Sequence, residues 1–343
     1  MIAPREDEDK YNICLIGSGG VGTIASLVLE KSRRANVTVV LRSRYEVIKD
    51  KGWNIESVDH GNLTGWRPSG IASSVEDAAL HAERPFDYVV VTTKQLPDVY
   101  SVPELIRPVV KANHTAVVLI QNGIDIEVPV ISTFPSNPVM SAVSMIGSRT
   151  SGENTVIQVG TDVLTIGPHF HDGLDRERQL QSAREFVYMY TAGSRGAGAK
   201  TAECILTEDM PVARWQKLLW NATFNTLCAM MRMNVGELQS SGGRTMLLIP
   251  AMHEVYAIAK AVGHPPPEHM IDYYAYRLPD DCLYRPSMLF DLEHGRPMEL
   301  EVVLGNALKR AEEYNLVTPI LSTLYELLKL EQCKINQGRQ AVS

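Results

Sequence analysis

The sequence predicts an α/β domain with a parallel sheet, followed by an all-α domain, and three observations support this fold class. A glycine-rich loop follows the first predicted strand, β-branched runs alternate with helical patterns in the first half, and helical patterns dominate the second half. The chain of 343 residues exceeds the usual size of one domain, and 45% hydrophobic residues suffice for a sizeable core. We expect a boundary that gives domains of residues 1–207 and 208–343.

The first domain should contain parallel strands, because its β-branched runs are apolar on both faces and are separated by helix-length intervals. These runs occupy residues 13–16, 37–41, 88–92 and 116–120. Closely spaced β-like pieces follow, punctuated by glycines, and they predict an antiparallel extension of the same sheet at 139–146, 155–159 and 163–166. A helix at 176–190, a glycine-rich break at 192–198 and a last strand at 204–206 should complete the domain.

The second domain should be wholly helical, because apolar residues recur there at helical spacing. The expected helices occupy residues 209–233, 244–262, 287–295, 298–315 and 318–332. Two breaks separate some of them, a glycine pair at 242–243 and a proline run at 265–267.

Composition excludes several classes of function. A net charge of −7 disfavours a nucleic-acid partner, and no apolar run is long enough to span a membrane. Five scattered cysteines without a Cys-x-x-Cys pair indicate neither a disulfide framework nor a zinc site. The polar, acidic start of the chain does not resemble a targeting segment, so we expect a cytoplasmic protein.

Two further kinds of site are not expected. His169 and His171 follow Pro168 in what reads as a polar surface loop, without a third ligand nearby, so no metal is predicted. No serine–histidine–acid set is apparent in the sequence either.

A Gly-x-Gly-x-x-Gly pattern predicts a dinucleotide site. It lies between the first strand and an apolar helix, and its residues are Gly17, Ser18, Gly19, Gly20, Val21 and Gly22. The first glycine permits a tight turn, the second lets the backbone approach a pyrophosphate, and the third allows close packing of helix on strand. A glycine turn without a ligand is the alternative.

The residues after the second strand favour NADP over NAD. A carboxylate that would hold a ribose 2′-hydroxyl is expected there, but the sequence has Arg42 and Arg44. The guanidinium of Arg42 can pair with a 2′-phosphate, which a carboxylate would repel. The alternative is that Arg42 is only a solvated loop residue.

Polar residues also follow two later strands, at the edge where open α/β sheets bind ligands. Lys94 comes after the strand at 88–92, and Asn122 with Gly123 comes after the strand at 116–120. They are candidate site residues, although Asn122–Gly123 could be only a turn and Lys94 only the start of a helix.

A polar stripe interrupts the most hydrophobic helical segment of the chain. Lys217, Asn221 and Asn225 recur every four residues, which places them along one line of an α-helix whose other faces are apolar. Burial of amide and ammonium groups is costly without partners, so the stripe indicates a ligand-facing cleft. Hydrogen bonding between helices is the alternative.

These motifs resemble those of the ketopantoate reductases (2-dehydropantoate 2-reductases) over residues 11–330. The matching features are the glycine loop, Lys94, Gln121-Asn122-Gly123, Trp215-Gln216-Lys217 with both helix asparagines, a stretch from Pro286 to Asp291, and a stretch from Gly295 to Gly305. The resemblance implies a Rossmann-type first domain.

The resemblance also implies roles for individual residues. Lys217 would be the general acid, and Glu299 would orient both substrate and cofactor ribose as a second catalytic residue. Asn122, Asn221, Asn225 and Ser287 would bind the 2-oxo acid together with Lys217. Asn122, Lys94 and Glu299 would contact NADPH, besides the glycine loop and Arg42.

Departures from the family pattern concern the substrate. Tyr284 replaces a common substrate-binding asparagine three residues before Ser287, and Phe290 stands where glutamine is usual. Asn234 is offset by one residue from the family's asparagine before the Gly-Glu-Leu stretch and is a weak candidate.

We therefore expect NADPH-dependent reduction of a small branched 2-oxo acid to a 2-hydroxy acid, in a cleft between the two domains. The first candidate is ketopantoate to pantoate in pantothenate biosynthesis. The alternatives are a reductase of another bulky 2-oxo acid and a non-catalytic NADPH-sensing protein. The partner is a small molecule, and the oligomeric state is left open, a homodimer included.

Overall fold

The computed structural model describes residues 10–196 and 202–340 and divides them into two compact units. Unit 1 takes Met1–Lys94, Ser101–Gln121 and Glu127–Met210, whereas unit 2 takes Gln95–Tyr100, Asn122–Ile126 and Pro211–Ser343. Two short segments that follow strands of the sheet thus belong to unit 2. Across the described ranges, no helix combines the length and apolar character that a membrane span requires.

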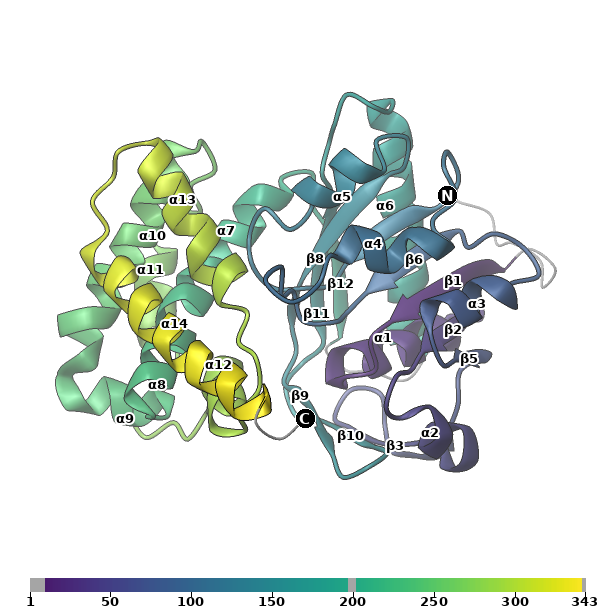
Figure 1. The fold of residues 1–343 in the computed structure, drawn as a ribbon, viewed down its shortest axis with the longest axis horizontal. Helices are drawn as coiled ribbons and strands as arrows, with labels where there is room; N and C mark the ends of the chain where they lie inside the picture. The colour runs from purple at the N-terminus through teal and green to yellow at the C-terminus, as the bar shows by residue number, and fades with distance from the viewer. Residues whose placement is uncertain (1–9, 197–201, 341–343) are drawn as a thin grey trace. The chain divides into compact units, whose positions relative to one another are not determined.

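Unit 1 is built on an eight-stranded sheet with the order β12-β11-β8-β7-β6-β1-β2-β5 (Figure 1). Every neighbouring pair is parallel except β8 with β11. The strands are β1 (Tyr11–Ile16), β2 (Ala35–Val40), β5 (Gly70–Ala72), β6 (Tyr88–Val91), β7 (Ala116–Leu119), β8 (Val139–Met145), β11 (Val163–Pro168) and β12 (Glu203–Leu206). The four predicted parallel strands and the last predicted strand are confirmed within two residues.

A second sheet corrects part of the predicted antiparallel extension, whereas the antiparallel pair of β8 and β11 in the main sheet confirms the rest. It has the order β4-β3-β10-β9, with β3 (Trp53–Ser57), β4 (Leu63–Trp66), β9 (Ser148–Ser151) and β10 (Thr155–Gln158). The strand predicted at 155–159 therefore leaves the main sheet, and the one predicted at 139–146 pairs in parallel with β7. Local sequence patterns indicate that a segment is extended, but they do not choose the strand that takes its hydrogen bonds.

The helices of unit 1 connect and cover these strands. They are α1 (Gly20–Lys31), α2 (Tyr45–Lys51), α3 (Val75–Leu80), α4 (Val102–Ile106) with a 3₁₀ turn at Arg107–Val109, α5 (Val128–Thr133) and α6 (Arg176–Gly196). The predicted break at 192 is wrong, because α6 continues through Gly193, where a Cβ would overlap the carbonyl of Val28 in α1. Glycine there allows close helix packing, and residues 197–198 of the predicted break lie outside the described residues.

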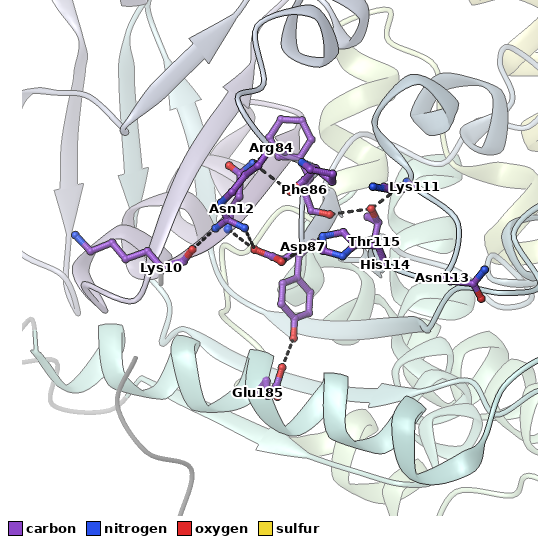
Figure 2. A network of polar contacts seen from close by, with 12 residues as sticks. Lys10, Asn12, Arg84, Phe86, Asp87, Lys111, Asn113, His114, Thr115 and Glu185 are labelled. Carbon is purple, nitrogen blue, oxygen red and sulfur yellow. Dashed lines mark hydrogen bonds and ion pairs between the residues drawn. The ribbon is translucent and has the colours of Figure 1, made fainter. Parts of the chain in front are cut away.

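The amino ends of β1 and β6 are held by a network of polar contacts (Figure 2). Asn12 donates its backbone N–H to Asp87 Oδ2 at 2.7 Å, and Arg84 Nη1 donates to the same oxygen at 3.0 Å. Thr115 Oγ1 donates to the Phe86 carbonyl at 2.8 Å. These bonds satisfy polar groups at the amino edge within the unit, which is opposite to the edge where the candidate ligand residues lie.

Unit 2 is helical, as predicted. Its elements are α7 (Met210–Trp220), a π-helical turn (Asn221–Asn225), α8 (Thr226–Met231), α9 (Val235–Leu238), a second segment with π-helical turns (Gln239–Leu248), α10 (Ile249–Ala261), α11 (Met270–Tyr276), α12 (Ser287–Glu293), a third π-helical turn (Glu301–Gly305), α13 (Asn306–Glu313) and α14 (Pro319–Gln340). The second segment has a kink at Gly242, whose φ is +84°, at the predicted glycine break. Neither α9 nor α11 was predicted.

Candidate active site

The glycine-rich loop of unit 1 uses its three motif glycines in different ways. Gly17 has φ +114°, and a Cβ there would lie 2.6 Å from Thr92 Oγ1. A Cβ on Gly22 would overlap the Gly17 carbonyl, whereas a Cβ on Gly19 would meet nothing within 4 Å. Gly17 and Gly22 therefore serve the packing of loop, helix and β6, and Gly19 borders open space.

Gly19 is also the N-cap of the 12-residue helix α1, whose first turn contains no acidic residue. The first backbone N–H groups of a helix and its dipole favour an anion at this end. Open space at Gly19 next to these donors fits the approach of a pyrophosphate, so this loop can hold a dinucleotide.

Arg42 lies beside this loop. Ile16 of β1 pairs in parallel with Val40 of β2, so the residues after both strands emerge at the same edge of the sheet. Arg42 is exposed at this edge, and the half-buried Arg44 stands directly before α2. The edge beside the glycine loop therefore carries positive charge.

Lys94 emerges at the same edge after β6, since Ile16 also pairs with Val91 and Val91 pairs with Leu119 of β7. The ends of β6 and β7 are tied together, because Gln121 Nε2 donates to the Thr93 carbonyl at 2.7 Å. The half-buried Lys94 is thus placed next to the predicted dinucleotide residues of unit 1.

The predicted polar stripe forms a cluster in unit 2. Asn221 and Asn225 are 5% and 6% exposed, and Asn225 Nδ2 donates to Asn221 Oδ1 at 3.2 Å. At 3.5 Å, the outer limit of a hydrogen bond, Asn225 Nδ2 approaches Ser287 Oγ and Asn221 Nδ2 approaches Asn122 Oδ1. Residues from three separate segments of the sequence therefore meet.

The helix that carries the stripe is not a regular α-helix. Residues Asn221–Asn225 form a π-helical turn between α7 and α8. Such turns are rare in proteins, and those that occur are often found at functional sites. Helical spacing predicted the common line of these side chains, but the sequence contains no signal for the wider turn.

Glu299 joins the cluster through two hydrogen bonds. Its Oε1 accepts the backbone N–H of Gln95 at 2.9 Å, and its Oε2 accepts Asn122 Nδ2 at 2.8 Å. Because both oxygens are engaged by donors, the carboxylate is oriented between the 95–100 and 122–126 segments. Gln95 is a partner that sequence reasoning missed, since a backbone donor leaves no trace in the residue type.

The 122–126 segment is fixed against the third π-helical turn. Gly123 has φ +94°, and a Cβ there would lie 2.5 Å from Val302 Cβ, so this position requires glycine. Ile124 N–H donates to the Val302 carbonyl at 3.1 Å, and Arg214 Nη1 donates to the Gly123 carbonyl at 2.6 Å. Asn122 is therefore presented from a rigid turn.

Lys217 has the most informative electrostatic environment of the cluster. The pKa of its ammonium is lowered to about 8, chiefly by burial and also by the positive charge of Arg214, whereas the charge of Glu299 acts in the opposite direction. A lysine with a pKa near neutrality can exchange its proton during a reaction at ordinary pH. Arg214, one turn earlier on α7, was missed in the sequence, although its spacing of three residues could have revealed it.

Other candidate residues have structural roles. Asn234 caps α9 in a reciprocal capping box with Glu237, with hydrogen bonds of 2.8 and 2.7 Å. The prediction that His169 lies in a surface loop is wrong, because it is 6% exposed and lies between Ser141 Oγ at 2.7 Å and Glu127 Oε1 at 3.4 Å. This is a serine–histidine–acid arrangement that the sequence did not reveal, but Ser141 is fully buried. No group of metal-ligating side chains occurs within the described parts of the chain.

The two departures from the family pattern are aromatic rings on the surface of unit 2. The Tyr284 ring lies 6.3 Å from that of Trp220, and the Arg277 guanidinium lies 5.7 Å from the Trp220 ring centroid. The Phe290 ring packs against that of His294 in a tilted arrangement, with 4.0 Å between the ring centroids, and Phe290 is 36% exposed. Tyr284 thus replaces a small amide with an aromatic group close to a guanidinium.

Comparison with known proteins agrees with these motifs. Two family models match, ketopantoate reductase PanE/ApbA at residues 13–170 and its C-terminal domain at residues 209–332. The uncharacterized protein YDL144C of Saccharomyces cerevisiae is 38% identical, with 95% of each chain covered. The 2-dehydropantoate 2-reductase of Nostoc sp. is 28% identical, with 98% of this chain and 99% of that protein covered.

Solved structures give the same result. The crystal structure of 2-dehydropantoate 2-reductase from Methylococcus capsulatus matches with a TM-score of 0.78 and 33% identity, over 94% of this chain and 97% of that chain. The fold class of a Rossmann-type domain plus a helical domain is thereby confirmed. The chain belongs to the ketopantoate reductase family of dinucleotide-dependent oxidoreductases.

Proposed function

We propose that this protein reduces 2-dehydropantoate (ketopantoate) to pantoate with NADPH, as a step of pantothenate biosynthesis. The observation that carries the proposal is the partly buried Lys217, which has a pKa of about 8 and is close to the charge of Glu299. It lies about one turn before the buried Asn221 and two turns before the buried Asn225. Membership of a reductase family supports the reaction class.

NADPH, when bound, supplies the hydride. The residues fit such a group, because Gly19 borders open space at the start of α1 and the exposed Arg42 can pair with a 2′-phosphate. Lys94 would add a positive charge at the same sheet edge, and Asn122 and Glu299 would contact the cofactor.

The residues of unit 2 would perform the proton chemistry. Addition of hydride to the carbonyl carbon leaves negative charge on its oxygen, and Nζ of Lys217 would donate a hydrogen bond and then its proton to that oxygen. Asn122, Asn221, Asn225 and Ser287 would bind the 2-oxo acid, since amide and hydroxyl donors suit a carboxylate. Glu299, held by Gln95 and Asn122, would orient the substrate.

The proposal is tested by replacement of the proton donor. In Lys217→Ala, kcat for ketopantoate should fall by about 10²–10⁴-fold while NADPH affinity stays nearly unchanged. Stopped-flow NADPH oxidation with both ligands saturating measures the hydride step, and circular dichroism checks folding. A folded variant that transfers hydride at the wild-type rate would remove Lys217 from the chemistry.

A second candidate is reduction of another bulky 2-oxo acid. Tyr284 favours it, because this ring packs near Trp220 and the Arg277 guanidinium at the position of a common substrate-binding amide. Wild-type kcat/KM values for ketopantoate and for branched, aromatic and dicarboxylic 2-oxo acids distinguish the two candidates. A preference of more than about tenfold for a larger acid would select the second.

A non-catalytic NADPH sensor is disfavoured by the cluster itself. A sensor needs the glycine loop and Arg42, but it does not need Lys217, the buried asparagines and an oriented Glu299. Absence of turnover with every acid of the panel would favour it. A cytoplasmic location remains part of the proposal.

A further inference from the structure

Arg214 is a buried cation directly before the motif Trp215-Gln216-Lys217. Its side chain is only 4% exposed, and it lies on α7 three residues before Lys217. Residues three apart on a helix share a face, so both cations project from the same side of α7. Arginine is seldom buried, and its charge must be compensated by acceptors.

One acceptor of Arg214 belongs to the segment that carries Asn122. Nη1 of Arg214 donates to the Gly123 carbonyl at 2.6 Å. Asn122, the preceding residue, donates to Glu299 Oε2 at 2.8 Å and lies 3.5 Å from Asn221 Nδ2 through its own Oδ1. The hydrogen bond of Arg214 therefore fixes the backbone from which Asn122 reaches both the carboxylate and the polar stripe.

The second effect of Arg214 is electrostatic. A guanidinium keeps its proton at every relevant pH, so unfavourable interaction between the two cations can be relieved only by loss of a proton from Lys217. Burial and the charge of Arg214 both lower the pKa of Lys217, against the effect of Glu299.

We propose that Arg214 is a positioning residue for the reduction, which fixes the Asn122–Gly123 backbone and places a permanent second positive charge beside the ammonium of Lys217. The inference rests on the proposed function of Lys217 as proton donor. Arg214 itself would not touch the substrate.

Two substitutions separate the two effects. Arg214→Gln removes the charge and keeps an N–H donor, whereas Arg214→Lys keeps the charge and loses the guanidinium. The reaction needs protonated Lys217, so wild-type kcat/KM should decline above about pH 8. In Arg214→Gln this decline should move to higher pH by at least about 0.5 unit, and in Arg214→Lys it should stay in place while kcat falls.

The matched control is Arg310→Gln. Arg310 Nε donates to Asp125 Oδ2 at 3.0 Å, so it holds the same 122–126 segment as Arg214 does. Since Arg310 is not among the groups that shift the pKa of Lys217, the decline of kcat/KM should not move in this variant. If the pH at which kcat/KM declines is the same in Arg214→Gln as in the wild type and the control, the inference is overturned.

A measurement without turnover separates this inference from the proposed function. Trinitrobenzenesulfonate reacts with a lysine amine only in its neutral form. Mass spectrometry of the peptide that contains Lys217 measures the labelling of this residue separately from that of the other lysines. The midpoint of labelling against pH should lie near 8 in the wild type and higher in Arg214→Gln. A midpoint that does not differ in a folded variant overturns the role of Arg214, whereas lack of turnover with a normal labelling shift overturns only the proposed reduction.

Discussion

Lys217 lies in surroundings that favour its neutral form, and this has a cost for the fold. Its pKa is lowered from 10.5 to about 8, so the folded protein holds the ammonium less well than the unfolded chain does. At a pH below 8 both states are protonated, and the penalty of up to roughly 3 kcal/mol is fully present. Between pH 8 and 10.5 the unfolded state binds more protons, so stability should rise with pH.

Replacement of this lysine should therefore stabilise the protein. Lys217→Met removes the buried charge and keeps the length of the side chain, so at pH 7 the free energy of unfolding should increase by roughly 1–3 kcal/mol. Urea unfolding of wild type and variant at pH 7 and pH 10 measures this increase in the free energy of unfolding, which should be smaller at pH 10. An equal gain at both pH values would show that the lysine is not the group that titrates.

Glu299 should act through orientation, because its oxygens accept bonds from Gln95 and Asn122. Glu299→Gln keeps the shape of the side chain but replaces one acceptor oxygen with an NH₂ group, which cannot accept the hydrogen bond that this oxygen accepts in the wild type. We expect KM for the 2-oxo acid to rise by about tenfold and kcat to fall as well. Steady-state kinetics of this variant beside Lys217→Ala test the difference, and a change in kcat alone would contradict the orienting role.

At the scale of elements, the glycines of the β1–α1 unit have two different roles. Gly17 and Gly22 allow close packing, whereas Gly19 borders open space. A Cβ on Gly22 would overlap the Gly17 carbonyl, but a Cβ on Gly19 would meet no atom within 4 Å. The same motif therefore contains a position that the fold needs and a position that only a ligand would need.

Two alanine variants should separate these positions. Gly22→Ala should destabilise the protein by roughly 1–3 kcal/mol through overpacking. Gly19→Ala should leave the Tm unchanged but weaken NADPH binding by about tenfold or more, because the methyl group takes space near the phosphates. Thermal unfolding measures the change in stability, and calorimetric titration measures the change in NADPH affinity. If folded Gly19→Ala binds NADPH as tightly as the wild type does, the loop is only a structural turn.

At the scale of the molecule, NADPH should stabilise the folded chain by mass action. At a concentration of 100 times its Kd, a ligand adds about 2.7 kcal/mol to the free energy of unfolding. In the wild type, NADPH should raise the Tm more than NADH does, because Arg42 can pair with the 2′-phosphate.

Arg42→Asp should cancel this difference or reverse it, since a carboxylate repels the phosphate and suits a ribose hydroxyl. Differential scanning fluorimetry with both cofactors gives the result, and Arg33→Asp, in the turn before β2, serves as a charge-matched control. A variant that keeps the NADPH preference would refute the role of Arg42.

Local patterns in the sequence determined much of this protein. Alternation of β-branched and helical segments predicted the parallel strands, and the order strand, loop, helix predicted the placement of Gly17, Gly19 and Gly22. Spacing of four residues predicted that Lys217, Asn221 and Asn225 share one line. Each of these features depends on residues close together in the chain, where the geometry of a helix or strand fixes what can meet.

Tertiary structure alone decided which distant groups become partners. The strand at Thr155–Gln158 pairs with β3 rather than with the main sheet, and Gly193 continues a helix because α1 lies against it. Likewise, Arg214 meets the carbonyl of Gly123, 91 residues away, and Glu299 meets the backbone of Gln95, 204 residues away. Backbone donors and acceptors are the same in almost every residue, so the sequence carries no local signal for such pairs, and they form only when the whole chain packs.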